Sequence, residues 1–242
     1  MQWEIATGPV AYPDALARMG DHVRAMRDGS AGELAWLVEH PPLYTQGTSG
    51  DVADVLTRAL PVFETGRGGQ VTYHGPGQRV AYLMLDLNTR GKDIRAYVKK
   101  LEATIIAALK EFGVEGFTRD GRIGVWVDVV KEKEKHSRVA PKLREPFTAG
   151  VSEAKGVQAP LPSNEAKIAA LGVRVQGWVT SHGIAMNVNP DLSHYRGIVP
   201  CGIREFGVTS LWALGVQVSM HEVDQALQRA FTQVFENKAA AA

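Results

Sequence analysis

The sequence predicts an α+β protein that folds as a single domain, with helices packed on a mixed, largely antiparallel sheet. In three segments, apolar residues recur at steps of three and four, which is the spacing of one helix face. Between these segments lie extended apolar stretches, several of them joined by turns too short for a helical crossover. Strands joined in that way pair antiparallel. A chain of 242 residues is long enough to bury one sizeable core.

Three helices are expected. The first runs over about residues 13–28, because a proline opens it and Gly29 stops it. The second ends at Gly113, and its apolar face consists of Ile94, Tyr97, Val98, Leu101, Ile105 and Ala108. The third begins at Ser219-Met220-His221-Glu222, a capping-box pattern that satisfies free N–H groups at a helix start. Its buried stripe consists of Val223, Leu227, Ala230, Phe231 and Val234.

Six extended segments are candidate strands. They are residues 3–7, 33–39, 71–87 (interrupted at Gly75-Pro76-Gly77), 123–130, 167–175 and 178–188. A tight turn around Gln176-Gly177 joins the last two, which predicts a hairpin.

A basic segment separates the fourth candidate strand from the fifth. Residues 131–144 contain six Lys or Arg against two Glu, a local net charge of +4. No apolar period runs through this segment, so we expect an exposed loop, either a solvated charge run or a docking patch for an acidic partner. The predicted domain covers residues 1–236, with this basic insertion at about 128–164, and residues 237–242 are expected to form a frayed tail.

Composition excludes several classes of function. The net charge of +1 gives no general attraction to nucleic acid or to a membrane surface. The first residues show no basic region followed by an apolar one, so no secretory signal is expected, and no apolar run approaches the ~18 residues of a membrane-spanning helix. Seven histidines show no zinc-ligand spacing, and one cysteine cannot form a thiolate cage. We therefore expect a cytoplasmic protein that needs no metal or other cofactor.

Cys201 is the one cysteine, in Ile198-Val199-Pro200-Cys201-Gly202-Ile203, so it cannot form an internal disulfide. It is either a small buried hydrophobe or a nucleophile, and the flanking Pro200 and Gly202 leave room around the sulfur. Lys167 opens an apolar stretch, where burial would lower its pKa and make it a base for the thiol, unless it is an ordinary surface lysine. His74 and His182 remain alternative partners for the thiol.

A glycine-rich segment, residues 67–78, holds four glycines in twelve positions. Such a segment presents backbone N–H groups to an oxyanion or a phosphate, or it forms a tight hairpin corner. It matches neither the dinucleotide-binding fingerprint nor the Walker loop.

Seven motifs follow one another along most of the chain. They are Glu39-His40-Pro41-Pro42-x-Tyr44-Thr45, the glycine-rich segment 67–78, Gly124-Val125-Trp126-Val127, segment 167–175, Trp178-Val179-Thr180-x-His182-Gly183-x-Ala185-x-Asn187, segment 198–203 and Val208-Thr209-Ser210-Leu211. In this order they resemble the octanoyltransferases of lipoate biosynthesis. The resemblance implies a fold like the catalytic domains of biotin and lipoate protein ligases.

The resemblance also implies a reaction and its partners. An octanoyl group passes from acyl carrier protein, through a thioester on Cys201, to a lysine ε-amine of a lipoyl domain. Such domains occur in 2-oxoacid dehydrogenase E2 subunits and in the glycine cleavage H protein. Lys167 matches the lysine that lowers the pKa of the thiol and serves as acid and base. Substrate-binding positions carried over are Arg67, Gly68, Gly69, Gln70, Val71, Thr72, Tyr73, His74, Ala170, Leu171, Gly172, Gly183, Ile184 and Ala185.

Two details of the site are expected from the residues themselves. Small side chains would make room for an acyl tail, namely Ala169, Ala170, Gly172, Gly183 and Ala185. Backbone N–H groups near Gly75 to Gly77, or beside Cys201, would stabilise the tetrahedral oxyanion. Three rival functions remain open: an ATP-dependent lipoate or biotin ligase, a catalytically silent binding protein for the carrier or the lipoyl domain, and a cysteine hydrolase.

Overall fold

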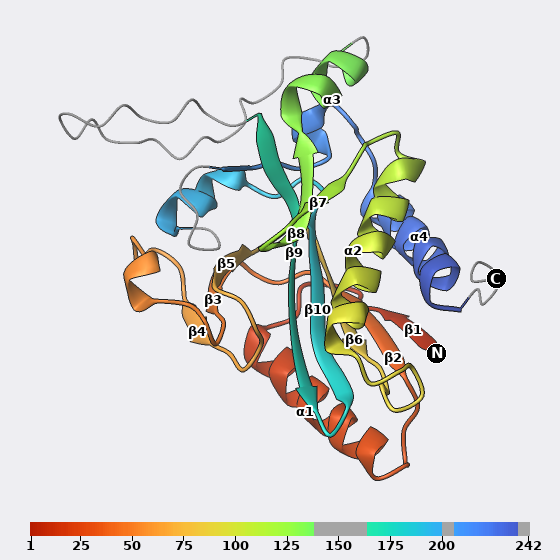
Figure 1. Ribbon diagram of the computed structural model, residues 1–242. Helices are drawn as coiled ribbons and strands as arrows, with labels where there is room; N and C mark the ends of the chain where they lie inside the picture. Colours follow the sequence, from red (N-terminus) through yellow and green to blue (C-terminus); the bar gives the residue numbers. More distant parts are fainter. Residues whose placement is uncertain (138–163, 200–205, 237–242) are drawn as a thin grey trace.

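The computed structural model describes residues 1–137, 164–199 and 206–236 (Figure 1). In these residues a central sheet has the strand order β1-β2-β6-β10-β9-β8-β7, and β11 lies beside β9. Its strands are β1 (Gln2–Ile5), β2 (Leu34–Val38), β6 (Gln78–Met84), β7 (Phe117–Arg119), β8 (Arg122–Asp128), β9 (Glu165–Gln176), β10 (Val179–Asn187) and β11 (Gly207–Val208). The β1–β2 and β11–β9 pairs are parallel and the others are antiparallel, so the predicted α+β class is confirmed.

Helices cover both faces of this sheet. On one face, α2 (Ile94–Glu111) and α4 (Met220–Phe231) lie side by side (Figure 1) and pack on the strands through Leu101, Leu227 and their neighbours. On the other face, α1 (Tyr12–Arg27) packs on Trp36, Val80 and Tyr82. Successive side chains of a strand point to opposite faces, and β6 therefore contributes to both cores.

The three predicted helices are present, but Val234, expected in the buried stripe of the third, lies beyond α4 in Thr232–Glu236 and is only half-buried. The expected capping box opens α4: the Glu222 N–H donates to Ser219 Oγ at 3.2 Å, and the Ser219 N–H donates to Glu222 Oε2 at 2.7 Å. The predicted hairpin is also present, because β9 and β10 are joined through Gly177 and Trp178, with φ values of 57° and 67°. Two consecutive left-handed residues make the turn whose twist matches the flanking strands.

A second sheet, not predicted from the sequence, has the order β4-β3-β5. It is formed by β3 (Leu43–Gln46), β4 (Val62–Glu64) and β5 (Val71–His74). The predicted strand 71–87 is therefore two strands in two sheets, divided at the turn of Gly75-Pro76-Gly77.

The expected exposed loop begins later than predicted, because Val129–His136 form helix α3. Asp128 caps this helix by accepting from the Lys131 N–H at 3.0 Å. Glu132, only 1% exposed, accepts from the Glu115 N–H at 3.2 Å and lies 3.3 Å from His136 Nε2. One carboxylate of the charge run is thus buried and fixes the helix on the domain. Residues 138–163 and the expected tail 237–242 lie outside the described residues, so the docking patch stays a prediction.

Candidate active site

A cavity of about 360 Å³ lies along β9, between the central sheet and the loop that precedes β5. Among the residues proposed for substrate binding or catalysis, those that line it are Lys167, Arg67, Gly68, Gly69, Gln70, Val71, Thr72, His74, Ala170, Leu171, Gly172, Gly183, Ile184 and Ala185. Tyr73 does not line the cavity; its ring packs against Tyr44 and Tyr195. Cys201 lies outside the described residues.

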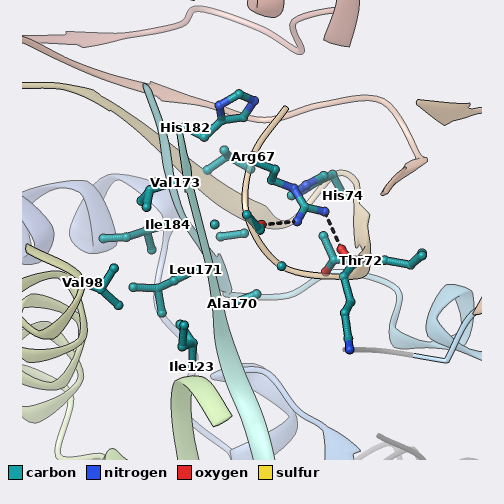
Figure 2. Close-up of a pocket in the computed structure, with 18 of the residues that line it drawn as sticks. Arg67, Thr72, His74, Val98, Ile123, Ala170, Leu171, Val173, His182 and Ile184 are labelled. Carbon is teal, nitrogen blue, oxygen red and sulfur yellow. Dashed lines mark hydrogen bonds between the residues drawn. The ribbon is translucent and has the colours of Figure 1, made fainter. Parts of the chain in front are cut away.

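The cavity has an apolar side and a polar side. Figure 2 shows Val98, Leu171 and Ile123 on one side of strands β9 and β10, and Arg67 and His74 on the other. Sequence reasoning did not assign several lining residues, namely Tyr12, Ser49, Val80, Tyr82, Val98, Gly121, Arg122, Ile123 and Val173. Val98 was predicted only as part of a helix stripe, and Val173 lies in motif 167–175 without having been assigned to the site. No local motif marks the others.

A bulge in β9 sets which side chains reach the cavity. Trp126 of β8 pairs with Lys167, but its neighbour Val125 pairs with Ala169. Ile168 is therefore the extra residue of a β-bulge. A bulge turns the side chains that follow it. As a result Ile168 and Ala169 both point into the core, and Lys167 lines the cavity together with Ala170. The expectation that Ala169 makes room for an acyl tail is therefore wrong.

β8 pairs with β9 only as far as Ala169. Beyond that point the edge of β9 is covered by the glycine-rich loop, residues 67–70, which is the first part of the glycine-rich segment. The Gly68 N–H donates to the Val173 carbonyl at 2.9 Å, which adds the loop to the sheet. Gly172 faces this loop, and a Cβ placed on it would lie 2.9 Å from Arg67 Cδ and 3.0 Å from the Gly68 carbonyl oxygen. The close approach of loop and strand therefore needs glycine at position 172.

Arg67 organises this loop from within. Its side chain is buried, and Nη2 donates to the Thr45 carbonyl at 2.9 Å, the Thr45 hydroxyl at 2.7 Å and the Gln70 carbonyl at 3.0 Å. Nη1 donates to the Gly68 carbonyl at 3.0 Å. The planar fork of a guanidinium can serve several oxygens at once, which a lysine ammonium cannot do in this geometry.

The second half of the glycine-rich segment is a tight turn between β5 and β6, which lie in different sheets, so it is not a hairpin. The Gln78 N–H donates to the Gly75 carbonyl at 3.1 Å, and the Gly77 N–H donates to Glu39 Oε1 at 2.7 Å. None of Gly75, Pro76 and Gly77 lines the cavity. The N–H of Gly77, one of those expected to stabilise an oxyanion, is therefore already engaged.

His74 is a structural histidine in this structure. Nδ1 lies 2.7 Å from Gln78 Oε1, and Nε2 lies 3.2 Å from Thr45 Oγ1. Burial, followed by the nearby His40 and the positive charge of Arg67, lowers the pKa of His74 to about 3. With both ring nitrogens engaged and the ring neutral, His74 is poorly suited to activate a thiol.

Lys167 is buried, so its interpretation as a surface lysine is wrong. Its Nζ donates to the Ile123 carbonyl at 3.1 Å and lies 4.8 Å from the centre of the Trp126 ring. Lys167 pairs with Val208 of β11, and the ring of Phe206 contacts Trp126 at 5.4 Å. The first described residues after Cys201 thus lie directly beside Lys167.

The described residues contain no group of three or more His, Cys, Asp or Glu side chains that could hold a metal ion. None of their helices is both long enough and apolar enough to span a membrane.

Residues 11–232 match the family described as the lipoyl protein ligase A/B catalytic domain. The chain belongs to this family. Within it, the chain is 50% identical over 236 residues to an octanoyltransferase of Rhodospirillum rubrum, which covers 97% of this chain and 95% of that protein. It is 52% identical over 239 residues to an octanoyltransferase of a Jannaschia species, covering 97% and 99%. These similarities support octanoyl transfer, an acyltransferase activity, as the function of this lipoyl ligase-type domain.

Solved structures confirm the fold. A bipartite lipoate protein ligase from Thermoplasma acidophilum, described together with its E2 lipoyl domain, superposes with a TM-score of 0.61 at 17% identity, covering 97% of this chain and 84% of that chain. A lipoate-protein ligase A bound with ATP also gives a TM-score of 0.61, at 15% identity, covering 97% and 85%. At such identities the likeness concerns the fold alone.

Proposed function

We propose that this protein transfers an octanoyl group from octanoyl-acyl carrier protein to the ε-amine of a lysine on lipoyl domains, through a thioester on Cys201. The observation that carries the proposal is the position of Lys167. Its amine lies in the wall of the cavity, and its strand partner Val208 follows the Cys201 segment closely. The lipoyl domain described with the Thermoplasma ligase supports the class of acceptor.

The chemistry divides into two acyl transfers. Lys167, acting as base, takes the proton of the Cys201 thiol, and the thiolate attacks the carbonyl carbon of the donor thioester. The tetrahedral adduct collapses, the carrier thiolate leaves, and Lys167 returns the proton to it. In the second transfer the acceptor amine attacks the Cys201 thioester, gives up its proton to Lys167 and becomes an amide, while the Cys201 sulfur leaves and is protonated again.

No nucleotide is needed for this sequence. Exchange of one thioester for another is nearly isoenergetic, and conversion of a thioester to an amide is downhill. A reduced thiol is required, which fits a cytoplasmic location. The apolar side of the cavity supplies binding, since burial of six methylenes contributes about 5 kcal/mol at ~0.8 kcal/mol each.

The proposed lipoyl-domain acceptors are those of 2-oxoacid dehydrogenase E2 subunits and the glycine cleavage H protein. Mixing the enzyme with octanoyl-acyl carrier protein and measuring its intact mass tests the first transfer. We expect a gain of one octanoyl group that hydroxylamine removes, and no such gain in Cys201→Ser. Lys167→Met, which keeps the length of the side chain but not its charge, should slow the gain by two or more orders of magnitude.

The same assay separates the rival functions. Formation of octanoyl-lipoyl domain from free octanoate and ATP would favour a ligase. Rapid release of octanoate from the loaded enzyme would favour a hydrolase, whereas a transferase excludes water from the loaded site. Binding of the carrier without any mass gain would indicate a silent binding protein.

A further inference from the structure

His182 of β10 is a strained residue in the cavity wall. Its φ of 60° is left-handed, a conformation that strains a residue with a side chain and is retained where the surroundings impose it. The side chain is 5% exposed, and Nε2 is buried without a hydrogen-bond partner in the described residues. Since a buried polar atom normally has a partner, a group that this atom can bind belongs in the cavity.

The groups around His182 keep its ring neutral. Burial first, then the positive charges of Arg67 and Arg174, lower its pKa to about 3. Ser181 Oγ lies 3.4 Å from Nδ1, and the Tyr82 ring stands perpendicular to the imidazole at 6.0 Å. A neutral imidazole can donate or accept at Nε2, so the complementary ligand is an uncharged hydroxyl or carbonyl.

His182 and Lys167 both line the cavity, at positions far apart along the β9–β10 strand pair. His182 pairs with Val173, which is six residues beyond Lys167 on β9, or ~20 Å between backbone positions at about 3.3 Å per residue. The lysine side chain covers part of this span, because its amine reaches the Ile123 carbonyl. Figure 2 shows Leu171 between His182 and Ile123. An extended eight-carbon chain, with carbon–carbon bonds of about 1.5 Å, measures about 9 Å, which is shorter than this span of ~20 Å.

We propose that His182 forms a polar subsite at the distal end of the acyl cavity and thereby selects the length and the terminal group of the acyl chain. The proposal rests on the proposed function, which puts the thioester beside Lys167 and directs the tail along β9. A chain with one carbon more than octanoyl pushes a methyl group against Nε2 and leaves that atom unpaired. A terminal hydroxyl at the same place hydrogen-bonds to it.

Two substrates of equal length test the subsite without any mutation. Nonanoyl and 8-hydroxyoctanoyl groups have the same number of heavy atoms in the chain and differ only at the end. On acyl carrier protein, we expect kcat/KM for 8-hydroxyoctanoyl to exceed that for nonanoyl by about tenfold, the ratio that the loss of one buried hydrogen bond produces. In His182→Leu the ratio should fall to one or below.

His182→Gly tests the length of the cavity. This variant relieves the left-handed backbone and removes the ring. The ratio of kcat/KM for decanoyl to kcat/KM for octanoyl should therefore rise by up to about fourfold per added methylene. Trp178→Gly is the matched control, because it relieves the other strained position of the same strand pair (φ 67°) outside the cavity. It should leave the chain-length profile unchanged.

The outcomes distinguish the two proposals. If the wild-type enzyme transfers octanoyl but treats nonanoyl and 8-hydroxyoctanoyl alike, the assignment of His182 is wrong and the proposed function stands. If it transfers no acyl group from the carrier, both fail.

Discussion

Nη2 of Arg67 donates to both oxygens of Thr45, at 2.9 Å to the carbonyl and at 2.7 Å to the hydroxyl. Thr45 belongs to β3 of the small sheet, and the loop of Arg67 joins the central sheet through Gly68 and Val173. This one contact therefore ties the two sheets together beside the cavity. That Arg67 binds the acyl group stays a prediction; its hydrogen bonds fix the loop that forms the cavity wall.

Arg67→Lys should lower kcat/KM for octanoyl transfer by at least tenfold. The ammonium group retains the charge but cannot serve the four acceptors of the guanidinium, and a hydrogen bond to a charged group contributes about 1.5–3 kcal/mol. Arg174→Lys, at an exposed position near Gly66, is the control and should change the rate little. Equal rates for the two variants would show that the conformation of the loop does not depend on the guanidinium hydrogen bonds of Arg67.

Gly172→Val should obstruct the cavity. Its Cβ would stand 3.0 Å from the Gly68 carbonyl, and its methyl groups would enter the space next to Ala185 and Ala170. We expect a rise in KM for the octanoyl donor of tenfold or more, with a loss of about 1–3 kcal/mol in unfolding free energy from overpacking. Gly32→Val, at a position with open space around it, is the control. An unchanged KM in Gly172→Val would place the acyl chain elsewhere.

Elements with strong local signals were predictable from the sequence. The helices follow from apolar periodicity, and the β9–β10 hairpin follows from its short turn. The small sheet was missed because β4 has only three residues, too few to show an alternating pattern. Helix α3 was missed because Glu132 reads as part of a solvated charge run, and only the tertiary fold supplies its buried partner, the Glu115 N–H.

The cavity was only partly predictable for a related reason. Strict alternation places Lys167 and Ala170 on opposite faces of their strand, and the bulge at Ile168 that brings them to one face leaves no mark in the local sequence. That Nε2 of His182 has no hydrogen-bond partner among the described residues is likewise a property of packing. The order of the motifs indicated the family and its activity, while the depth and polarity of the site required the fold.

The free energy of unfolding should decrease as the pH falls below about 6.5. The pKa values of His74 and His182 are each lowered to about 3 in the folded protein, chiefly by burial. Below the unfolded value of about 6.5 the unfolded chain binds a proton at each position and the native state does not. Their contribution is therefore complete above pH 6.5 and is lost as the pH falls toward 3, at about 1.4 kcal/mol per pH unit for each histidine.

Urea unfolding of the wild type and of His74→Gln between pH 4.5 and 7.5 measures this effect. As the pH falls, the unfolding free energy of the variant should decrease less steeply than that of the wild type. The difference in slope should be the contribution of one histidine, about 1.4 kcal/mol per pH unit. Parallel curves would mean that His74 is protonated in the native state.

Removing one partner of the buried ion pair between Arg79 of β6 and Asp224 of α4 should destabilise the protein, whereas replacing both partners by apolar residues should be tolerated. Arg79 Nε lies 2.7 Å from Asp224 Oδ1, and the two side chains are 6% and 4% exposed. Burial raises the pKa of Asp224 although Arg79 opposes this, so the pair is costly to desolvate. Asp224→Asn leaves a buried guanidinium without its counter-charge and should lower the unfolding free energy by about 3–5 kcal/mol.

The double variant Arg79→Met with Asp224→Leu removes both charges and should regain most of that loss, since apolar replacements of similar volume avoid the desolvation of two ions. The control is Glu111→Gln, which breaks the exposed pair that Arg229 of the same helix forms with α2 and should have little effect. Unfolding in urea measures the unfolding free energy of all three variants. A double variant as unstable as Asp224→Asn would mean that the ion pair holds α4 on the sheet through its geometry, and that apolar packing at this position cannot take its place.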